Sequence, residues 1–300
     1  MLVQLLINGM ITGAVYALAA LGFSLIYRST KIFHIAHAAV FTTAAYFLFL
    51  FYNQVHLDLF MSILLSLLCT GILGVLMEIT VYHPLFKDEA SSSVMLVSSI
   101  GIMAIVINSI AMIWGNENKI IISGISKTVK INNPLAEPGS PFKEIILTIP
   151  QLYQFFVSLL VIAMVMIFLH YTKSGKKIKA ICDNDRLVEI FGVSLTRYRV
   201  SIFFIGSTMA GLASILFAVD FGMDPYVGMP VLLIAAVAVI VGGVEYFWGA
   251  VLGGFLLGFA KALVVWKMSA RWENMIVFLL LIVFLLFRPE GILSRKRRKA

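Results

Sequence analysis

Long apolar runs alternate with short polar stretches along the whole chain, and this pattern predicts its elements. The runs cover residues 2–27, 32–52, 59–79, 94–114, 151–171, 200–219, 229–244, 249–266 and 275–287. Because lipid cannot pair with backbone N–H and C=O groups, runs of about 20 apolar residues predict membrane-crossing helices. The seventh and ninth runs are shorter and predict tilted, broken or re-entrant helices. We therefore expect an all-α polytopic bundle of about eight or nine membrane segments, with residues 1–300 forming one domain.

Two polar stretches are longer than the other connections. Residues 115–150 are rich in turn-forming residues, which predicts a compact exposed cap outside the membrane. Residues 173–199 are basic and contain a helix-like run at 180–191, with apolar positions between charged ones. Such an amphipathic helix can lie on a membrane surface or fill a partner's groove, although the pattern also suits a solvated connector helix. Gly192, directly after the run, is predicted to cap the helix at positive φ.

The composition places the chain among integral membrane proteins, because 61% of its residues are hydrophobic, 13% are charged and the mean hydropathy is +0.99. The net charge of +8 reflects basic residues near segment ends, so it predicts topology and not nucleic-acid binding. The basic cluster at 295–299 predicts a cytoplasmic C-terminus, and counting back places the N-terminus outside. Sixteen Lys and Arg residues then lie inside and six outside, with Lys261 in a span.

Other classes of protein leave patterns that this sequence lacks. A G-x-x-x-x-G-K-[ST] motif is missing, so any ATP chemistry must belong to another chain. Cys69 lies in an apolar run and Cys182 in the basic stretch, which argues against a disulfide or a metal framework. Few carboxylates lie at mid-membrane, which disfavours a secondary transporter, and no constellation typical of a membrane-embedded enzyme is visible. We expect no cofactor on this chain.

Four ordered blocks between residues 8 and 293 share a family pattern. They are Asn8-Gly9 with Gly13 and Tyr16-Ala17-Leu18; Ile35-Ala36-His37 with Tyr46; Gly242-Gly243 with Gly249-Ala250, Gly253-Gly254 and Gly258; and Arg288-Pro289-Glu290-Gly291. Together they resemble the LivH-like permeases, the membrane subunits of branched-chain amino acid ABC importers. The chain departs from the family pattern at His34, Ala38 and Ala44, where the family has Asn, Gly and Gly, and at Glu245-Tyr246, where it has Gly-Ser.

The resemblance implies a permease that works by alternating access and has several partners. These are a second permease, either identical or a LivM-like heterodimer partner; two ABC ATPase subunits, which would carry ATP and Mg; and an extracytoplasmic solute-binding protein. The implied location is the bacterial inner (plasma) membrane. Branched-chain amino acids are the implied substrates. Other amino acids, urea, amides or another small polar solute stay open as substrates, and a secondary transporter stays open as an alternative class.

The resemblance also assigns the 173–199 stretch to a cytoplasmic coupling loop. Permeases of ABC importers carry an E-A-A-x-x-x-G element that docks on the ATPase. Gly192 stands at its glycine, and Arg186, Leu187 and Val188 replace Glu-Ala-Ala. The residues implied in coupling are Ala180, Asp183, Arg186, Leu187, Val188, Glu189, Phe191 and Gly192.

Glycines in two of the blocks are candidates for helix packing or for a gate. They are Gly9, Gly13, Gly242, Gly243, Gly249, Gly253, Gly254 and Gly258. Packing is the favoured interpretation, because small residues let helices approach closely in lipid.

Polar residues at membrane depth point to a translocation pathway, because an unpaired charge there is costly. The candidates are Asn8, Tyr16, His34, His37 and Glu78. The two histidines are three residues apart and are expected on one helix face, and they lack the further ligands that zinc needs. The alternative for Glu78 is a surface carboxylate paired with Lys or Arg.

Two acids and one lysine remain near the predicted outer side. Asp220 and Asp224, at the outer end of the sixth run, suit contact with a binding protein or an ammonium group, or are solvated loop acids. Lys261 is expected to snorkel toward the membrane surface.

Overall fold

The computed structural model describes residues 2–121, 128–132 and 144–293. Part of the predicted outer cap, including Asn133, Pro134, Pro138, Gly139 and Pro141, and the basic cluster at 295–299 lie outside the described residues.

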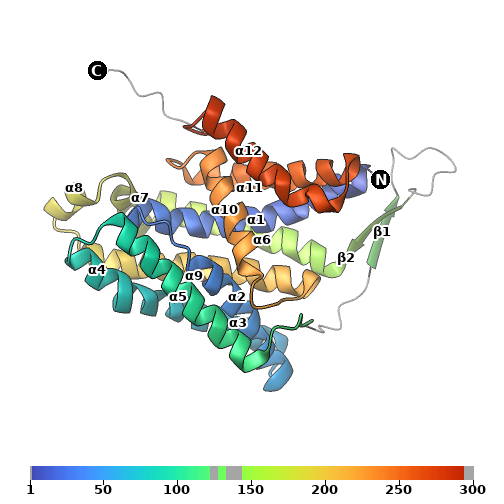
Figure 1. Cartoon of the computed structure of the whole chain (residues 1–300), viewed down its shortest axis with the longest axis horizontal. Coiled ribbons are helices and arrows are strands. Elements are labelled where there is room, and N and C mark those ends of the chain that lie inside the picture. The colour runs from blue at the N-terminus through green and yellow to red at the C-terminus, as the bar shows by residue number, and fades with distance from the viewer. Residues whose placement is uncertain (1, 122–127, 133–143, 294–300) are drawn as a thin grey trace.

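The fold is an all-α polytopic bundle, as the apolar runs predict (Figure 1). In the described ranges, seven helical stretches are long and apolar enough to cross a membrane: α1 (Leu2–Thr30), α3 through α4 (Leu59–Lys87), α5 (Ser92–Trp114), α6 (Ile149–Tyr171), α9 (Leu195–Phe221), α11 (Phe247–Lys267) and η3 with α12 (Ala270–Phe287). Two apolar runs form shorter helices, α2 (His37–Phe49), which continues as the π-helix η1 (Leu50–Gln54), and α10 (Gly228–Gly242). Each of the nine predicted runs is therefore helical, with residues 78–82 wound as a second π-helix, η2 (Glu78–Tyr82).

The first helix, α1, lies at the centre of the bundle. Every residue from Gly13 through Ile26 is buried, and α6, α9, α10 and α11 pack around it. Its closest neighbour is α11, where glycines face one another across the seam. A methyl group on Gly9 would lie 2.8 Å from the carbonyl oxygen of Gly258, and one on Gly254 would overlap the α1 backbone at Ala17. These contacts bring the two backbones together, which is how helices gain packing energy in lipid.

The turn between α10 and α11 is built from a second set of close glycine contacts. A methyl group on Gly249 would lie 2.6 Å from the carbonyl oxygens of Gly242 and Gly243. Gly243 has a φ of +109°, which suits a residue without Cβ. The chain after α12 returns to this turn, because the backbone N–H groups of Ile292 and Leu293 donate to Val241 and Gly242 at 2.9 and 3.0 Å.

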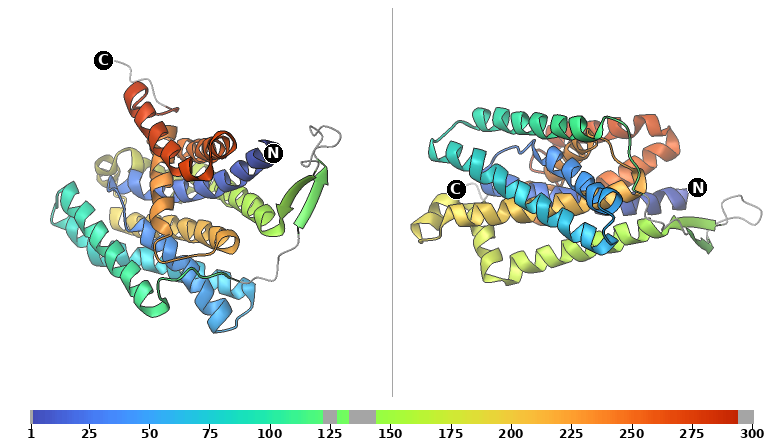
Figure 2. Two further views of the ribbon diagram at one scale, coloured as in Figure 1. Left: turned by 45° about the vertical axis from the view of Figure 1, so that its right-hand side comes forward. Right: turned by 90° about the horizontal axis from the view of Figure 1, so that it is seen from below.

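A short β-hairpin stands at the end of the bundle where α1 begins (Figures 1 and 2). Strand β1 (Thr128–Asn132) pairs antiparallel with β2 (Glu144–Thr148). Gln4 of α1 bonds to both backbone groups of Ile146 at 2.8 Å, which fixes the hairpin to the bundle. The strands add regular structure to a stretch for which the sequence predicts only a compact cap.

The opposite end of the bundle carries most of the basic residues that the structure describes, and we call it the basic end. Figure 1 shows α4 (His83–Lys87), α7 (Lys173–Asp183) and α8 (Asp185–Ile190) there, away from the hairpin. The C-terminal ends of α1 and α10 also reach it, since Lys31 and Val244 line one cleft. The first and last described residues therefore lie at opposite ends of the bundle (Figure 1).

Candidate functional site

The polar stretch at the basic end forms two helices where the sequence predicts one. The expected continuous helix over residues 180–191 is wrong, because α7 ends at Asp183 and α8 begins at Asp185. Asn184 lies between them with extended backbone (φ −159°, ψ 100°), and its side-chain oxygen accepts a hydrogen bond from the Leu187 N–H at 3.0 Å. Asparagine is favoured at a helix N-cap and disfavoured inside a helix, so Asn184 favours a break at this position.

The end of α8 follows the prediction. Gly192 has a φ of +78°, and its N–H donates to the carbonyl of Glu189 at 2.9 Å. The next N–H, of Val193, donates to the carbonyl of Val188 at 3.4 Å. These two bonds form a Schellman motif, which needs a left-handed residue at the position of Gly192. The glycine of the predicted coupling element is therefore a helix stop.

The outer face of α8 exposes large apolar side chains. Leu187, Ile190 and Phe191 are 51%, 80% and 78% exposed, whereas Val188 turns inward and is buried. The other candidates here are also exposed: Ala180, Asp183, Arg186, Glu189 and Gly192. We call Leu187, Ile190 and Phe191 the α8 apolar patch. A grouped apolar surface at a helix end outside the apolar runs is typical of a protein interface.

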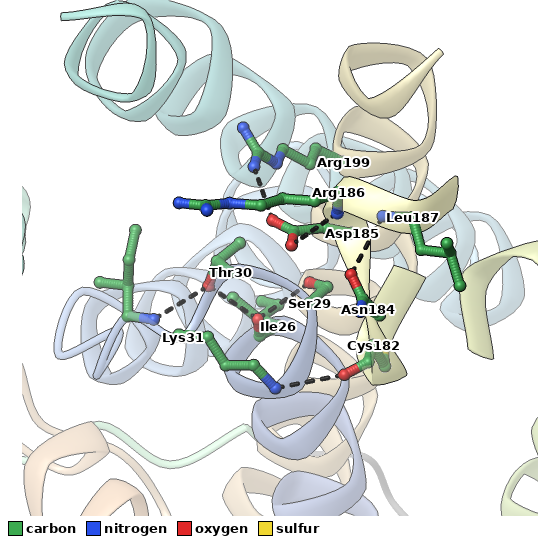
Figure 3. A network of polar contacts seen from close by, with 11 residues as sticks. Ile26, Ser29, Thr30, Lys31, Cys182, Asn184, Asp185, Arg186, Leu187 and Arg199 are labelled. Carbon is green, nitrogen blue, oxygen red and sulfur yellow. Dashed lines mark hydrogen bonds and ion pairs between the residues drawn. The ribbon is translucent and has the colours of Figure 1, made fainter. Parts of the chain in front are cut away.

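The helix α7 is attached to the end of the central helix α1. The guanidinium of Arg28, which is buried, lies 3.1 Å from a carboxylate oxygen of Asp183 and 4.1 Å above the ring of Phe247. Lys31 donates from Nζ to the carbonyl of Cys182 at 3.2 Å, as Figure 3 shows. Two side chains of α1 thus hold the last residues of α7.

The helix α8 is attached instead to α9. Arg199, near the start of α9, lies 3.8 Å from a carboxylate oxygen of Asp185 (Figure 3) and 3.8 Å above the ring of Phe86 in α4. The two helices of the basic stretch therefore contact different parts of the bundle, α7 reaching α1 and α8 reaching α9.

Cys182 is enclosed by these contacts. Its side chain is buried between α7 and the end of α1, and burial raises the pKa of the thiol to about 11. Neutral at ordinary pH and shielded from solvent, this thiol is part of the packing.

The polar candidates for a pathway lie at separate places. His34 and His37 are buried at the basic end, with ring centroids 5.7 Å apart, and His34 Nδ1 lies 2.8 Å from the Tyr82 hydroxyl. The expectation that both histidines lie on one helix face is wrong, because α2 begins at His37 and His34 belongs to the turn before it. In the described ranges, no group of three His, Cys, Asp or Glu side chains is arranged to hold a metal.

The position of Glu78 contradicts the alternative that it is a surface carboxylate. Its side chain is fully buried, on the same helix face as Thr70, Gly71 and Gly74 of α3, and among the described residues it forms no ion pair. A surface carboxylate paired with Lys or Arg is therefore wrong for this position.

The comparisons with known proteins cover nearly the whole chain. Residues 5–285 match the family described as branched-chain amino acid transport system, permease component. The chain belongs to this permease family. It is 26% identical to the high-affinity branched-chain amino acid transport system permease protein BraD of Pseudomonas aeruginosa, over 97% of this chain and 95% of that protein. The permease protein LivH of Escherichia coli K12 is likewise 26% identical, over 97% and 95% of the two chains.

One solved structure shares the fold of the permease. The structure of PsaBC from Streptococcus pneumoniae in complex with Fab matches with a TM-score of 0.52 and 13% identity, covering 94% of this chain and 91% of that chain. The predicted family, the helical membrane class and the multi-pass membrane localisation of the permease are thus confirmed.

The remaining candidates on α1 have side-chain partners. Tyr16 accepts a bond from Lys261 Nζ at 2.9 Å, and Lys261 lies 2.7 Å from Glu273. Lys261 is 7% exposed, so the expected snorkelling is wrong and an ion pair compensates the charge instead. Asn8, nearer the hairpin end of α1, accepts from Gln4 at 3.2 Å.

The two acids near the end of α9 are partly buried. Asp220 is in the last turn of α9 and faces Gln151 and Gln154 of α6. Asp224 accepts the backbone N–H of Tyr226 at 2.8 Å and so shapes the turn before α10.

Sequence reasoning missed Arg28 and Lys31 as anchors of α7, because no local signal connects residues so distant along the chain. It also missed the Asn184 cap, which an Asn three residues before Leu187 does signal.

Proposed function

We propose that this chain is the permease subunit of an ABC importer for branched-chain amino acids, and that α8 docks on a separate ATPase subunit. The α8 apolar patch is the observation that carries the docking proposal. Its three side chains are largely exposed at the basic end, while the helix itself is held in place by a capped start and a Schellman stop. A rigid helix with an apolar face suits a hydrophobic groove in a partner.

The attachments of α7 and α8 supply a route from docking to the bundle. Movement of α8 would act on α9 through the Asp185–Arg199 pair, and movement of the adjoining α7 would act on α1 through the Asp183–Arg28 pair. Because α1 and α9 pack against each other, a push at the basic end would shift two central helices together. Closure of an ATPase dimer around ATP and Mg can thus bias the bundle between two arrangements.

The partners follow from the family. The importer would contain two ATPase subunits, a second permease and a solute-binding protein at the hairpin end, with the basic end in the cytoplasm. The family description and the names of the two relatives support branched-chain amino acids as the substrate. Titrating the cognate binding protein with leucine and with urea distinguishes this substrate from an amide, since binding of urea alone contradicts it.

The docking assignment is tested by placing a charge in the α8 apolar patch. Leu187→Asp and Phe191→Asp should abolish uptake and co-purification of the ATPase, because burying an unpaired carboxylate in an interface costs several kcal/mol. Substrate binding to the soluble protein should be unchanged.

Two controls make the experiment specific. Leu187→Met keeps the apolar surface and should retain uptake. Thr196→Asp adds the same charge to the exposed first turn of α9, outside the α8 apolar patch, and should retain ATPase co-purification. If ATPase co-purification and uptake both survive Leu187→Asp and Phe191→Asp, the docking assignment is wrong.

A further inference from the structure

A groove of about 530 Å³ opens beside α7, between α3, α6 and the first turns of α9. Its inner wall is apolar, formed among others by Val75, Phe168 and Phe204. Its mouth at the basic end is polar, with Ser174, Arg197 and Ser201. The volume lies within the range of small-molecule sites.

The groove opens toward lipid. The helices on its two sides present exposed apolar side chains along the same depth, Ile72 and Leu76 on α3 and Met164 and Ile167 on α6, each 46–59% exposed. These faces contact hydrocarbon in a membrane, because α3 and α6 are both long and apolar enough to cross it. A molecule can therefore enter the groove sideways from the bilayer.

The mouth carries positive charge that forms no ion pair with the residues the structure describes. Lys177 lies 5.8 Å above the ring of Tyr198, which lines the groove next to Arg197. Among the ion pairs of the described residues, none involves Lys177 or Arg197, although the neighbouring Arg199 is paired with Asp185. The exposed Lys173 and Lys176 add to the same surface.

From this combination we propose that the groove binds one anionic phospholipid from the leaflet at the basic end. Its phosphate would lie among Arg197, Lys177 and the hydroxyls of Ser174 and Ser201, and an acyl chain would cover Val75 and Phe204. A soluble anion would leave the apolar wall exposed, and a neutral lipid would leave the cations unpaired. Basic pockets between membrane helices are a known way to hold anionic headgroups.

The lipid would contact the proposed coupling helices directly. Ile178, a buried residue of α7, also lines the groove, so the acyl chain would pack against α7. The inference itself needs only a membrane-embedded chain and does not depend on ATPase docking.

The test uses the full-length chain, purified in detergent with the subunits that accompany it. Native mass spectrometry would count bound phosphatidylglycerol, phosphatidylcholine or glycerol phosphate, each added separately. One phosphatidylglycerol per chain should be retained, and neither of the others at the same concentration. Equal retention of phosphatidylcholine, or full competition by glycerol phosphate, would overturn the proposal.

Variants separate the charge from the shape of the groove. Arg197→Gln and Lys177→Gln should each weaken phosphatidylglycerol binding about five-fold, since a basic side chain near an anionic surface contributes about 1 kcal/mol. Lys87→Gln removes an exposed charge from α4, at the same end but outside the groove, and should have no effect. Equal effects of Arg197→Gln and Lys87→Gln contradict the site.

Ser201→Trp fills the groove without changing charge and should abolish retention of the lipid. All variants must elute as single species, and Arg197→Gln changes only an exposed side chain, so it should fold. If Ser201→Trp retains the lipid, or releases an accompanying subunit in place of a lipid, the groove has another occupant and the proposal is wrong.

Discussion

The seam between α1 and α11 makes a sharp prediction about Gly254. At this position a methyl group would overlap backbone atoms of Ala17 in α1 and lie 2.8 Å from its Cβ. The nearest atoms belong to a helix backbone and not to a flexible side chain. Gly254→Ala therefore forces the two helices apart along the most buried face of the bundle.

The size of the effect follows from two opposing contributions. Replacing glycine by alanine inside a helix gains about 0.5–1 kcal/mol, because the unfolded chain loses freedom. Overpacking a tight contact costs about 1–3 kcal/mol or more. At Gly101, on α5, a new methyl group meets nothing within 4 Å, so only the gain applies. The gain is common to both variants, so they should differ by the overpacking cost, about 1–3 kcal/mol in the free energy of unfolding.

The assay is thermal unfolding of the full-length chain in detergent, measured as the fraction of protein that stays monodisperse at each temperature. Gly254→Ala should lower Tm by several degrees, and Gly101→Ala should leave it unchanged or raise it. Gly254→Val should be worse than Gly254→Ala, because the extra atoms need more room. If Gly254→Ala and Gly101→Ala have the same Tm, the close approach of α1 and α11 is incorrect.

Three further predictions concern charged and titratable side chains. Arg28→Gln should lower Tm more than Asp183→Asn. Arg28 is buried and stacked on an aromatic ring, whereas the Asp183 side chain is 64% exposed, so solvent screens the ion pair. An equal fall in Tm for the two variants would contradict this prediction. Glu273→Gln should destabilise the fold by about 1–3 kcal/mol, more than Lys261→Met does, because it leaves the more buried Lys261 charged and without its ion pair. The Tm of the double variant should recover part of the loss. In a Cys69→Ser background, maleimide should label Cys182 slowly at pH 7. The labelling rate should rise about tenfold per pH unit up to about pH 11, because only the thiolate reacts. Rapid labelling at pH 7 in the folded chain would show that the thiol is accessible and would contradict its burial.

The apolar runs predict the helices well because lipid leaves the backbone few alternatives. All nine runs are helical, and the glycines of the family pattern lie at close helix contacts, as packing without a hydrophobic force requires. These features depend on the local sequence and on the lipid environment, so one sequence is enough to predict them.

The features that sequence reasoning misplaced depend on contacts between distant segments. Glu78 is buried because the face of α3 that includes Gly71 and Gly74 packs on α9, and Lys261 does not snorkel because Glu273 reaches it from the next helix. Asn184 is a residue type favoured at a helix N-cap, but the apolar pattern continues across it and hides the break between α7 and α8. The attachment of α7 to Arg28 joins residues 155 apart along the chain and has no local signature.

The central position of α1 has a consequence for assembly in the membrane. α1 is synthesised before every other described helix, but its seam with α11 can form only when α11 (Phe247–Lys267) has also been made. Until then its small-residue surface faces lipid. A chain that ends before α11 would leave that surface uncovered.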